Sequence, residues 1–274
     1  RIEKKLNSNN GVKWEVINIG VGDFGTAQEW LALTKIGFGY SPDIVLHQIF
    51  PLNDICNNSI GLYGLCKSPN DRYRPYFIEA GKGLRLVSAQ PIRSFLRRNF
   101  VSYRIIERAM LEFIKRIGNS KLSEEQIRSI RLRRMGFPPL DPLLYTYVND
   151  SQQISQVADG WKVTEKIIED ISGQCRRRGA LYIIVVVPFE ACVGKRWSVF
   201  SSTCPKPEMI QDYPEARLKS LCRARGIHLL MLKDIFDLHE ELVYPWRDGH
   251  FNVNAHRLTA EAIYQKLTEE ELIH

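Results

Sequence analysis

The chain has 274 residues, of which 44% are hydrophobic and 25% charged, and its formal net charge is +7 at pH 7. This composition is typical of a globular protein with one large domain or two small ones, and it excludes disordered, collagen-like and coiled-coil chains. The longest apolar run, Ala180 to Phe189, is about half of the roughly 20 residues that a membrane-spanning helix needs, so the sequence predicts no transmembrane segment within these residues.

Short runs rich in β-branched residues alternate along the chain with segments of helical periodicity, which is the pattern of parallel βα units. The expected strands are Trp14 to Ile19, Ile44 to Phe50, Tyr182 to Val187 and Ile227 to Leu232. The expected helices are Thr26 to Ile36, Trp161 to Arg178, Pro214 to Arg225 and Ala255 to Leu267. The third strand is apolar without alternation, so we expect it to be a central parallel strand covered on both faces.

A long stretch, about residues 56–160, separates the second expected strand from the third, and we interpret it as a helical insertion or cap on the α/β core. Within it, Pro91 to Met135 has 12 Lys and Arg against 4 Asp and Glu, a net +8, which leaves −1 for the rest. Because large apolar residues are interleaved with the basic ones from Arg93 to Arg134, this segment favours amphipathic helices. Solvated helices that cover the site are favoured, followed by contact with an anionic membrane surface or acidic glycan, and nucleic-acid binding comes last.

The six cysteines form no C-x-x-C pair and have no His at zinc-finger spacing, so a structural zinc site is not expected. Mostly free and partly buried thiols are the favoured interpretation. Cys56 with Cys66, or Cys192 with Cys204, stay open as local bridges if the protein is exported. The cellular compartment is left undetermined.

Ligands of an open parallel sheet bind beyond the carboxyl ends of the strands, where this sequence places three motifs. A glycine-rich turn from Asn18 to Thr26 precedes a helix, and its backbone N–H groups can face an anion. Asn53-Asp54 follows the second expected strand, where the Asn side chain can donate to an oxyanion. Asp248 and His250 are two residues apart, so the carboxylate can orient the imidazole as a general base. Each motif taken alone has a plain alternative: a tight strand-to-helix turn, an Asx turn and an ordinary surface loop.

Together these motifs resemble the SGNH hydrolase superfamily, also called GDSL-like esterases and lipases. The resemblance covers Val16 to Glu29, Ser41 to Asp54, Arg74 to Phe77 and Gly226 to Leu267, and the last stretch, which includes DGHFNVNAHRLTAEAIYQKL, is its most specific part. It implies a three-layer α/β/α sandwich with a flavodoxin-like parallel sheet, here as a single domain over residues 1–274. It also implies ester hydrolysis without a metal or organic cofactor, on a small ester or an acylated glycan.

The resemblance assigns roles to individual residues. His250 resembles the base that takes the proton from a catalytic Ser, and Asp248 resembles the carboxylate that holds the His tautomer. Asn53 resembles the side-chain donor of the oxyanion hole. The backbone donor falls at Asp23, beside Gly22, in place of the glycine that is typical of the family, and the Asp23 carboxylate would repel an oxyanion if it pointed inward.

Two departures from the family pattern keep alternatives open. The Asp-x-His spacing of Asp248 and His250 is similar to that of polysaccharide O-acetyltransferases, which suggests acyl transfer to a glycan as the second activity. The Gly-Asp-Ser block that carries the nucleophile is absent, and Arg1 to Asn7 resembles the end of the helix that follows it. We therefore expect an N-terminally truncated domain, inactive by itself because it lacks the first strand and the catalytic Ser. A non-catalytic binding protein of the same fold is the third hypothesis.

Overall fold

The computed structural model describes residues 1–8, 12–62, 74–81, 83–87, 91–117, 142–149, 154–203, 209–239, 243–244, 250–270 and 272–273. The strands are β1 (Ile44–Ile49), β2 (Tyr76–Ala80), β3 (Gly83–Val87), β4 (Leu181–Val186) and β5 (His228–Met231). The helices are α1 (Ile2–Leu6), α2 (Thr26–Lys35), α3 (Pro51–Asn57), α4 (Pro91–Asn99), α5 (Val101–Ile117), α7 (Ser155–Arg177), α8 (Arg196–Thr203), α9 (Tyr213–Arg225), α10 (Leu232–Phe236) and α12 (Val253–Glu269). Short 3-10 turns cover Gly37–Tyr40, Ile60–Leu62, Pro142–Tyr147, Glu190–Cys192 and Asp237–His239.

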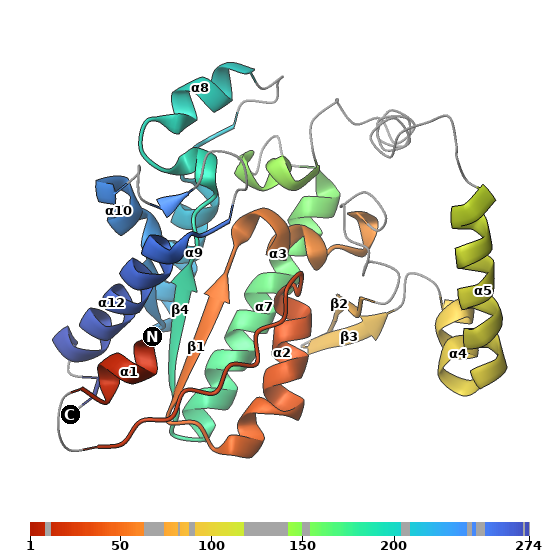
Figure 1. Ribbon diagram of the computed structural model, residues 1–274, viewed down its shortest axis with the longest axis horizontal. Coiled ribbons are helices and arrows are strands. Elements are labelled where there is room, and N and C mark those ends of the chain that lie inside the picture. The colour runs from red at the N-terminus through yellow and green to blue at the C-terminus, as the bar shows by residue number, and fades with distance from the viewer. Residues whose placement is uncertain are drawn as a thin grey trace.

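The centre of the molecule is a parallel sheet with the strand order β1-β4-β5 (Figure 1). Three of the four expected strands are confirmed within one or two residues, and so is their parallel pairing. The four expected helices are also present, but α7 begins at Ser155, six residues before the expected start at Trp161. The chain is therefore of the mixed α/β class. No helix in the described part is both long enough and apolar enough to cross a bilayer.

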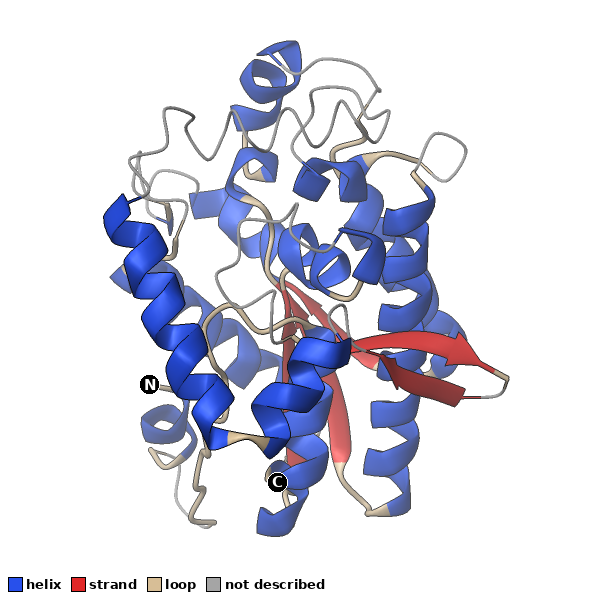
Figure 2. Cartoon of the chain, turned by 90° about the vertical axis from the view of Figure 1, so that its right-hand side faces the viewer, coloured by secondary structure: helices blue, strands red, loops and turns tan. Residues whose placement is uncertain are grey.

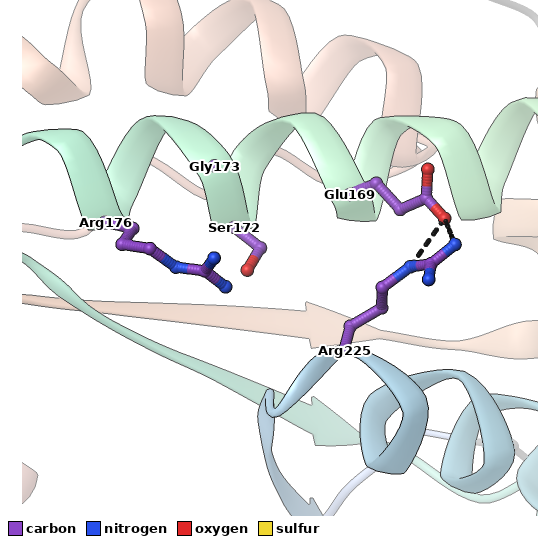
Figure 3. A pocket seen from close by; sticks show the side chains of 5 residues that line it. All are labelled: Glu169, Ser172, Gly173, Arg176 and Arg225. Carbon is purple, nitrogen blue, oxygen red and sulfur yellow. Dashed lines mark hydrogen bonds and ion pairs between the residues drawn. The ribbon is translucent and has the colours of Figure 1, made fainter.

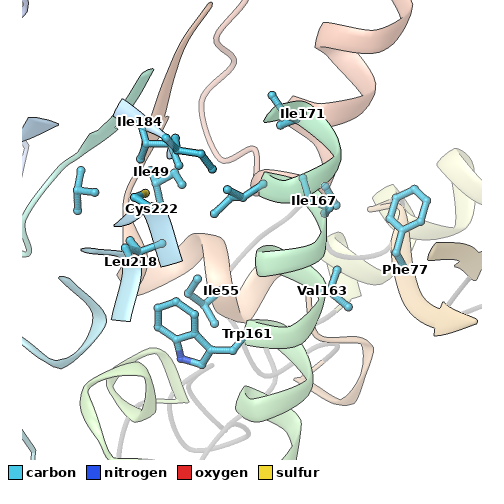
Figure 4. Packing of buried hydrophobic residues seen from close by; sticks show 14 of the residues in the cluster. Ile49, Ile55, Phe77, Trp161, Val163, Ile167, Ile171, Ile184, Leu218 and Cys222 are labelled. Carbon is cyan, nitrogen blue, oxygen red and sulfur yellow. The ribbon is translucent and has the colours of Figure 1, made fainter. Parts of the chain in front are cut away.

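The central strand β4 is covered on both faces, as its unbroken apolar sequence predicts. Its residues Tyr182, Ile184 and Val186 belong to a core cluster with Trp161 and Ile167 of α7. Figure 4 shows how the α7 side chains fill the space between the sheet and Phe77 of β2. The alternate residues of β4 face the opposite way. Among these, Val185 and Val187 pack with Leu232, Phe236, Ala255 and Leu258 of α10 and α12.

The first expected strand, Trp14 to Ile19, is a wrong prediction, because these residues form no strand in the structure. The backbone of this segment instead donates hydrogen bonds to side chains of α1 and of its C-cap residue. The Val16 N–H donates to the Glu3 carboxylate (2.8 Å) and the Trp14 N–H donates to the Asn7 side-chain oxygen (2.7 Å). A β-rich composition makes a strand only where a partner strand is available, and none lies beside this segment within the described ranges.

The expected insertion contains elements of two kinds. The β2–β3 hairpin was not anticipated, whereas α4 and α5 are helices, as the apolar and basic pattern predicts. In Figure 1 these two helices lie at the right-hand margin beyond β2 and β3, while the strands of the parallel sheet point upward. The α4 and α5 helices thus extend the molecule laterally, whereas residues 142–148 and 154–160 of the expected insertion pack into the core.

Three cysteines of the core, Cys175, Cys192 and Cys222, are buried free thiols, as expected. Burial raises the pKa of Cys175 and of Cys222 to about 11, so both stay protonated at neutral pH. Because Cys192 is a free thiol, the alternative bridge between it and Cys204 is not formed. Of the other three cysteines in the proposed bridges, Cys56 is buried in the core, and Cys66 and Cys204 lie outside the described residues.

Candidate functional site

The turn that joins β1 to α3 places Asn53 and Asp54 at the carboxyl edge of the sheet. Phe50 has an extended backbone and is the N-cap of α3, and Pro51 occupies the first helical position, where its missing N–H costs nothing. The Asp54 carboxylate accepts a hydrogen bond from the Phe50 N–H at 2.7 Å. The Asn53-Asp54 motif therefore lies in the first turn of α3, and the Asp54 side chain binds the backbone of the N-cap residue. The alternative of an Asx turn is wrong.

Asp54 is nearly inaccessible to water, with 3% of its surface exposed. Burial raises the pKa of its carboxyl group well above the ordinary value, and the nearby charge of Glu29 raises it further. The Phe50 N–H and the positive charge of Arg74 act in the opposite direction. Asp54 is thus a buried residue that stabilises the turn.

Asn53, the expected oxyanion donor, is half-buried on the same turn. Its side-chain oxygen Oδ1 is buried and accepts no hydrogen bond from the described residues. A buried amide oxygen without a partner is uncommon in folded proteins and is often found at functional positions. The structure thus places Asn53 where the sequence predicted it, directly beyond the carboxyl end of β1.

The glycine-rich turn lies against α3. A side chain at Gly25 would bring its Cβ to 2.6 Å from the Cβ of Asn57, so only glycine allows this approach. Asp23 has a φ of 68°, in the left-handed region that glycine favours, whereas Gly22 is exposed with open space around it. The two predicted backbone donors, at Gly22 and Asp23, are therefore on a turn packed against the helix that carries Asn53.

Arg74 pairs with the Asp23 carboxylate, a contact that the sequence reasoning did not foresee. The Arg74 Nη1 donates to the Asp23 carbonyl oxygen at 2.9 Å and to the Gln28 side chain, and its Nη2 lies 3.4 Å from Asp23 Oδ1. Only 4% of the Arg74 surface is exposed, and its charge also acts on Asp54. The sequence signal for this residue was the Arg74-Pro-Tyr-Phe block, whose role was not assigned.

His250 directly precedes the segment that starts α12. The Asn252 side chain is the N-cap of α12 and accepts hydrogen bonds from the Asn254 N–H (2.9 Å) and the Ala255 N–H (3.0 Å). Phe251 anchors the segment, since its ring centroid lies 5.1 Å from that of Phe236. His250 itself is exposed. Asp248, its predicted partner, lies outside the described residues.

A shared apolar cluster connects the two halves of the predicted site. Phe50, three residues before Asn53, packs against the cluster formed by α10, α12 and one face of β4. Phe251, adjacent to His250, packs against the same cluster. The segments that carry Asn53 and His250 thus pack against one apolar cluster, and the turn of Asp23 lies against α3. The approach of His250 to Asn53 stays a prediction. The pairing of Asp248 with His250 stays a prediction.

Two further polar groups are buried near the sheet. His47 on β1 lies with its Nε2 2.9 Å from Glu29 Oε2 and its Nδ1 2.7 Å from the Tyr182 hydroxyl. His47 is thus a core histidine with a partner at each ring nitrogen. Burial raises the pKa of the Tyr182 hydroxyl well above its usual range, so it is a neutral partner of the ring.

Glu215, in the first turn of α9, is the second buried group, and nothing in its sequence context indicated burial. Only 3% of its surface is exposed, and burial raises its pKa from 4.5 to about 7. Neither carboxyl oxygen makes a hydrogen bond of standard geometry to a described residue, although the Tyr147 hydroxyl is close enough to lower the pKa. The charge of Asp212 raises the pKa and that of Lys233 lowers it.

An open pocket lies at the other end of the sheet, where α7 and α9 end and β4 and β5 begin. Figure 3 shows its lining, in which Arg225 donates from Nε to Glu169 Oε1 at 2.8 Å; the other lining residues are Ser172, Gly173 and Arg176. Because ligands of parallel sheets bind at the carboxyl ends of the strands, this pocket is not the candidate site. In the described part of the chain, no group of three or more His, Cys, Asp or Glu side chains is placed to hold a metal ion.

The structure is that of an α/β protein with Asn53 at the carboxyl edge of a parallel sheet and the glycine-rich turn packed against α3. Comparison with known proteins adds no family: no family model matches the chain, and no curated protein or solved structure matches it significantly. The functional conclusion therefore depends on the geometry of the sheet and its edge.

Proposed function

We propose that the chain belongs to an ester hydrolase of the SGNH type, in which a strand and a catalytic Ser from outside these 274 residues complete the sheet and the active site. The observation that carries this proposal is the open edge of β1. Within the described ranges, β1 pairs only with β4, and its opposite edge has no partner strand. An unpaired edge beside a buried strand is a position at which a sheet can be extended.

The face of β1 supports the same proposal. Leu46 is paired in register with Ile183, and Gln48 with Val185, so each pair lies on the same face of the sheet. On β4 this face is buried under α12, whereas on β1 it is uncovered: 37% of Leu46 is exposed, against 1% of Ile183. An additional strand and its following helix would cover β1 as α12 covers β4. They would also bring a strand partner into reach of Trp14 to Ile19.

A parallel strand at this edge would place its carboxyl end next to Asn53. Neighbouring strands lie about 4.8 Å apart, and the carboxyl ends of parallel strands meet at the same edge. A Ser directly after such a strand would be beside the Asn53 side chain and the turn of Gly22 and Asp23. The sheet would then have the flavodoxin-like form that the resemblance implies.

In the resulting mechanism the Ser hydroxyl attacks the ester carbonyl while His250 accepts the hydroxyl proton and later donates it to the leaving alcohol. Asp248 holds the imidazole. The Asn53 amide and a backbone N–H of the Gly22–Asp23 turn donate to the oxyanion. Arg74 supports this role of the turn, because it pairs with the Asp23 carboxylate that would otherwise repel the oxyanion.

The test uses a longer chain that includes the residues preceding Arg1 in its reading frame, treated with a fluorophosphonate probe and assayed with a small acetate ester. We expect labelling of one Ser outside the 274 residues. His250→Ala should lower kcat by about 10⁴-fold. Asn53→Ala should lower it by about 10²-fold to 10³-fold.

His256→Ala is the matched control. His256 is an exposed histidine six residues after His250, and its ring lies edge-on against Phe251. It should keep full activity. The 274-residue chain alone should neither hydrolyse the ester nor react with the probe. Labelling of that chain at Ser41, Ser59 or any other Ser, or full activity of His250→Ala, would contradict the proposal. Transfer of the acetyl group to an added sugar in preference to water would assign the site to a glycan O-acyltransferase instead.

A further inference from the structure

The helices α4 and α5 form a hairpin, here called the α4–α5 hairpin (residues 91–117), which exposes its apolar side chains. Exposed fractions reach 76% for Ile92 and 65% for Ile105, while Glu107, which forms an ion pair with Arg97 at 3.5 Å, is only 7% exposed. The other large exposed apolar residues are Phe95, Phe100, Val101, Ile106 and Met110. A buried carboxylate beside exposed apolar side chains is the reverse of the arrangement that water favours.

The position of the hairpin leaves this apolar surface uncovered. Among the described elements, α4 and α5 pack chiefly against each other. Figure 1 shows them side by side at the margin of the molecule, and Figure 2 shows the same pair from the front, on the outer side of the β2–β3 hairpin. The apolar residues are therefore not part of the protein core.

Positive charge adjoins the apolar surface. Residues 91–117 contain seven Lys and Arg against two Glu, a net +5. At about 100° per residue, Val101, Ile105 and Ile106 fall within an arc of about 140° on α5, and the exposed Arg104 and Arg108 lie next to this arc on its Val101 side. A helix with an apolar face bordered by arginines has the two features that bind an anionic lipid surface.

We propose that the α4–α5 hairpin docks in the plane of an anionic phospholipid bilayer, with its apolar side chains at the boundary of headgroups and acyl chains and its arginines on the lipid phosphates. The charge argues against a second copy of the chain as the occupant, because +5 would then face +5. The aliphatic residues argue against nucleic acid or an acidic glycan, because neither offers an apolar layer for Ile92, Ile105 and Met110.

The experiment measures co-sedimentation of the 274-residue chain with vesicles of phosphatidylcholine alone or with about 30% phosphatidylserine. We expect binding to the anionic vesicles only, weakened as NaCl is raised from about 0.05 M to about 0.5 M. Replacing Ile105 and Ile106 by Ser should weaken binding at least about tenfold, because two exposed apolar side chains no longer enter the bilayer. Arg104→Gln with Arg108→Gln should weaken it about 25-fold, since each arginine near such a surface contributes about fivefold.

Matched controls remove the same groups from surfaces away from the hairpin. Leu238→Ser removes an apolar side chain that is 79% exposed, and Lys219→Gln with Arg223→Gln removes two exposed charges from one face of α9; both should bind like the wild type. Absence of binding, equal binding to neutral vesicles, or unchanged binding of the hairpin variants would overturn the proposal. The proposal would also be overturned if the wild-type chain formed a dimer that the double substitution Ile105→Ser and Ile106→Ser dissociates. The assay does not depend on the proposed hydrolase activity, so the two proposals can fail separately.

Discussion

The buried carboxyl group of Glu215 should make the stability of the protein fall as the pH rises from acid to mildly alkaline values. Its pKa in the folded chain is raised to about 7, against an ordinary value of 4.5, with burial as the main cause. Below pH 4.5 the group is protonated in both the folded and the unfolded chain, so it does not lower the free energy of unfolding. Between pH 4.5 and 7 the carboxyl group is ionised in the unfolded chain but still protonated in the folded chain. Folding then requires uptake of a proton, which becomes less favourable as the pH rises.

The size of the effect follows from the two pKa values. Each pKa unit corresponds to about 1.4 kcal/mol, so the ionisable Glu215 should lower the free energy of unfolding by about 3 kcal/mol between pH 4.5 and pH 8. The group is 3% exposed, so little of this effect is lost to solvent screening. Asp54, whose pKa is also raised, contributes a loss of the same sign.

The assay compares urea unfolding of the wild type and Glu215→Gln at several pH values. Gln keeps the shape of the side chain without a titrating proton, so the variant should equal the wild type near pH 4.5 and be more stable by about 3 kcal/mol at pH 8. The Asp54 contribution is common to both proteins and cancels. Glu269→Gln, at an exposed position on α12, is the control and should follow the wild type at every pH. Parallel stability curves for the wild type and Glu215→Gln would refute the reasoning.

Two pairs of substitutions test the packing and the capping of the helices. Gly160→Ala places a Cβ at 2.3 Å from the Ile55 carbonyl oxygen and should destabilise the chain by about 1–3 kcal/mol in urea unfolding. Gly173→Ala, on the same helix, meets only the flexible end of an arginine and should stabilise it by up to about 1 kcal/mol. Equal effects of the two would contradict this account. Asn252→Ala removes the N-cap of α12 and should lower the melting temperature through a loss of about 1 kcal/mol, whereas Asn254→Ala should not.

The sheet could be predicted from the sequence where the local pattern was sufficient. The apolar run of β4 predicted a central strand because a strand covered on both faces needs apolar residues at every position. The prediction failed at Trp14 to Ile19, whose composition is equally β-rich. A strand also needs a neighbour, and this segment has none in the described part of the chain.

The candidate site was predictable as motifs but not as contacts. Asn53 lies at the end of β1 as expected, because the position after a strand is a property of chain order. The pairing of Arg74 with Asp23 joins residues 51 positions apart, and no local periodicity indicates such a contact. Glu215 lies in a helical first turn, where an acidic residue is ordinarily exposed, so its burial also could not be predicted.

The sequence by itself determined which segments are apolar, which are helical and where the positive charge is concentrated, because these properties depend on neighbouring residues. Only the tertiary structure decided which strand edge has no partner among the described residues, which carboxylates are paired or buried, and that the α4–α5 hairpin exposes Ile92 and Ile105 while it covers Glu107. These features depend on desolvation and on hydrogen-bond partners from distant parts of the chain, and the fold alone brings those parts together.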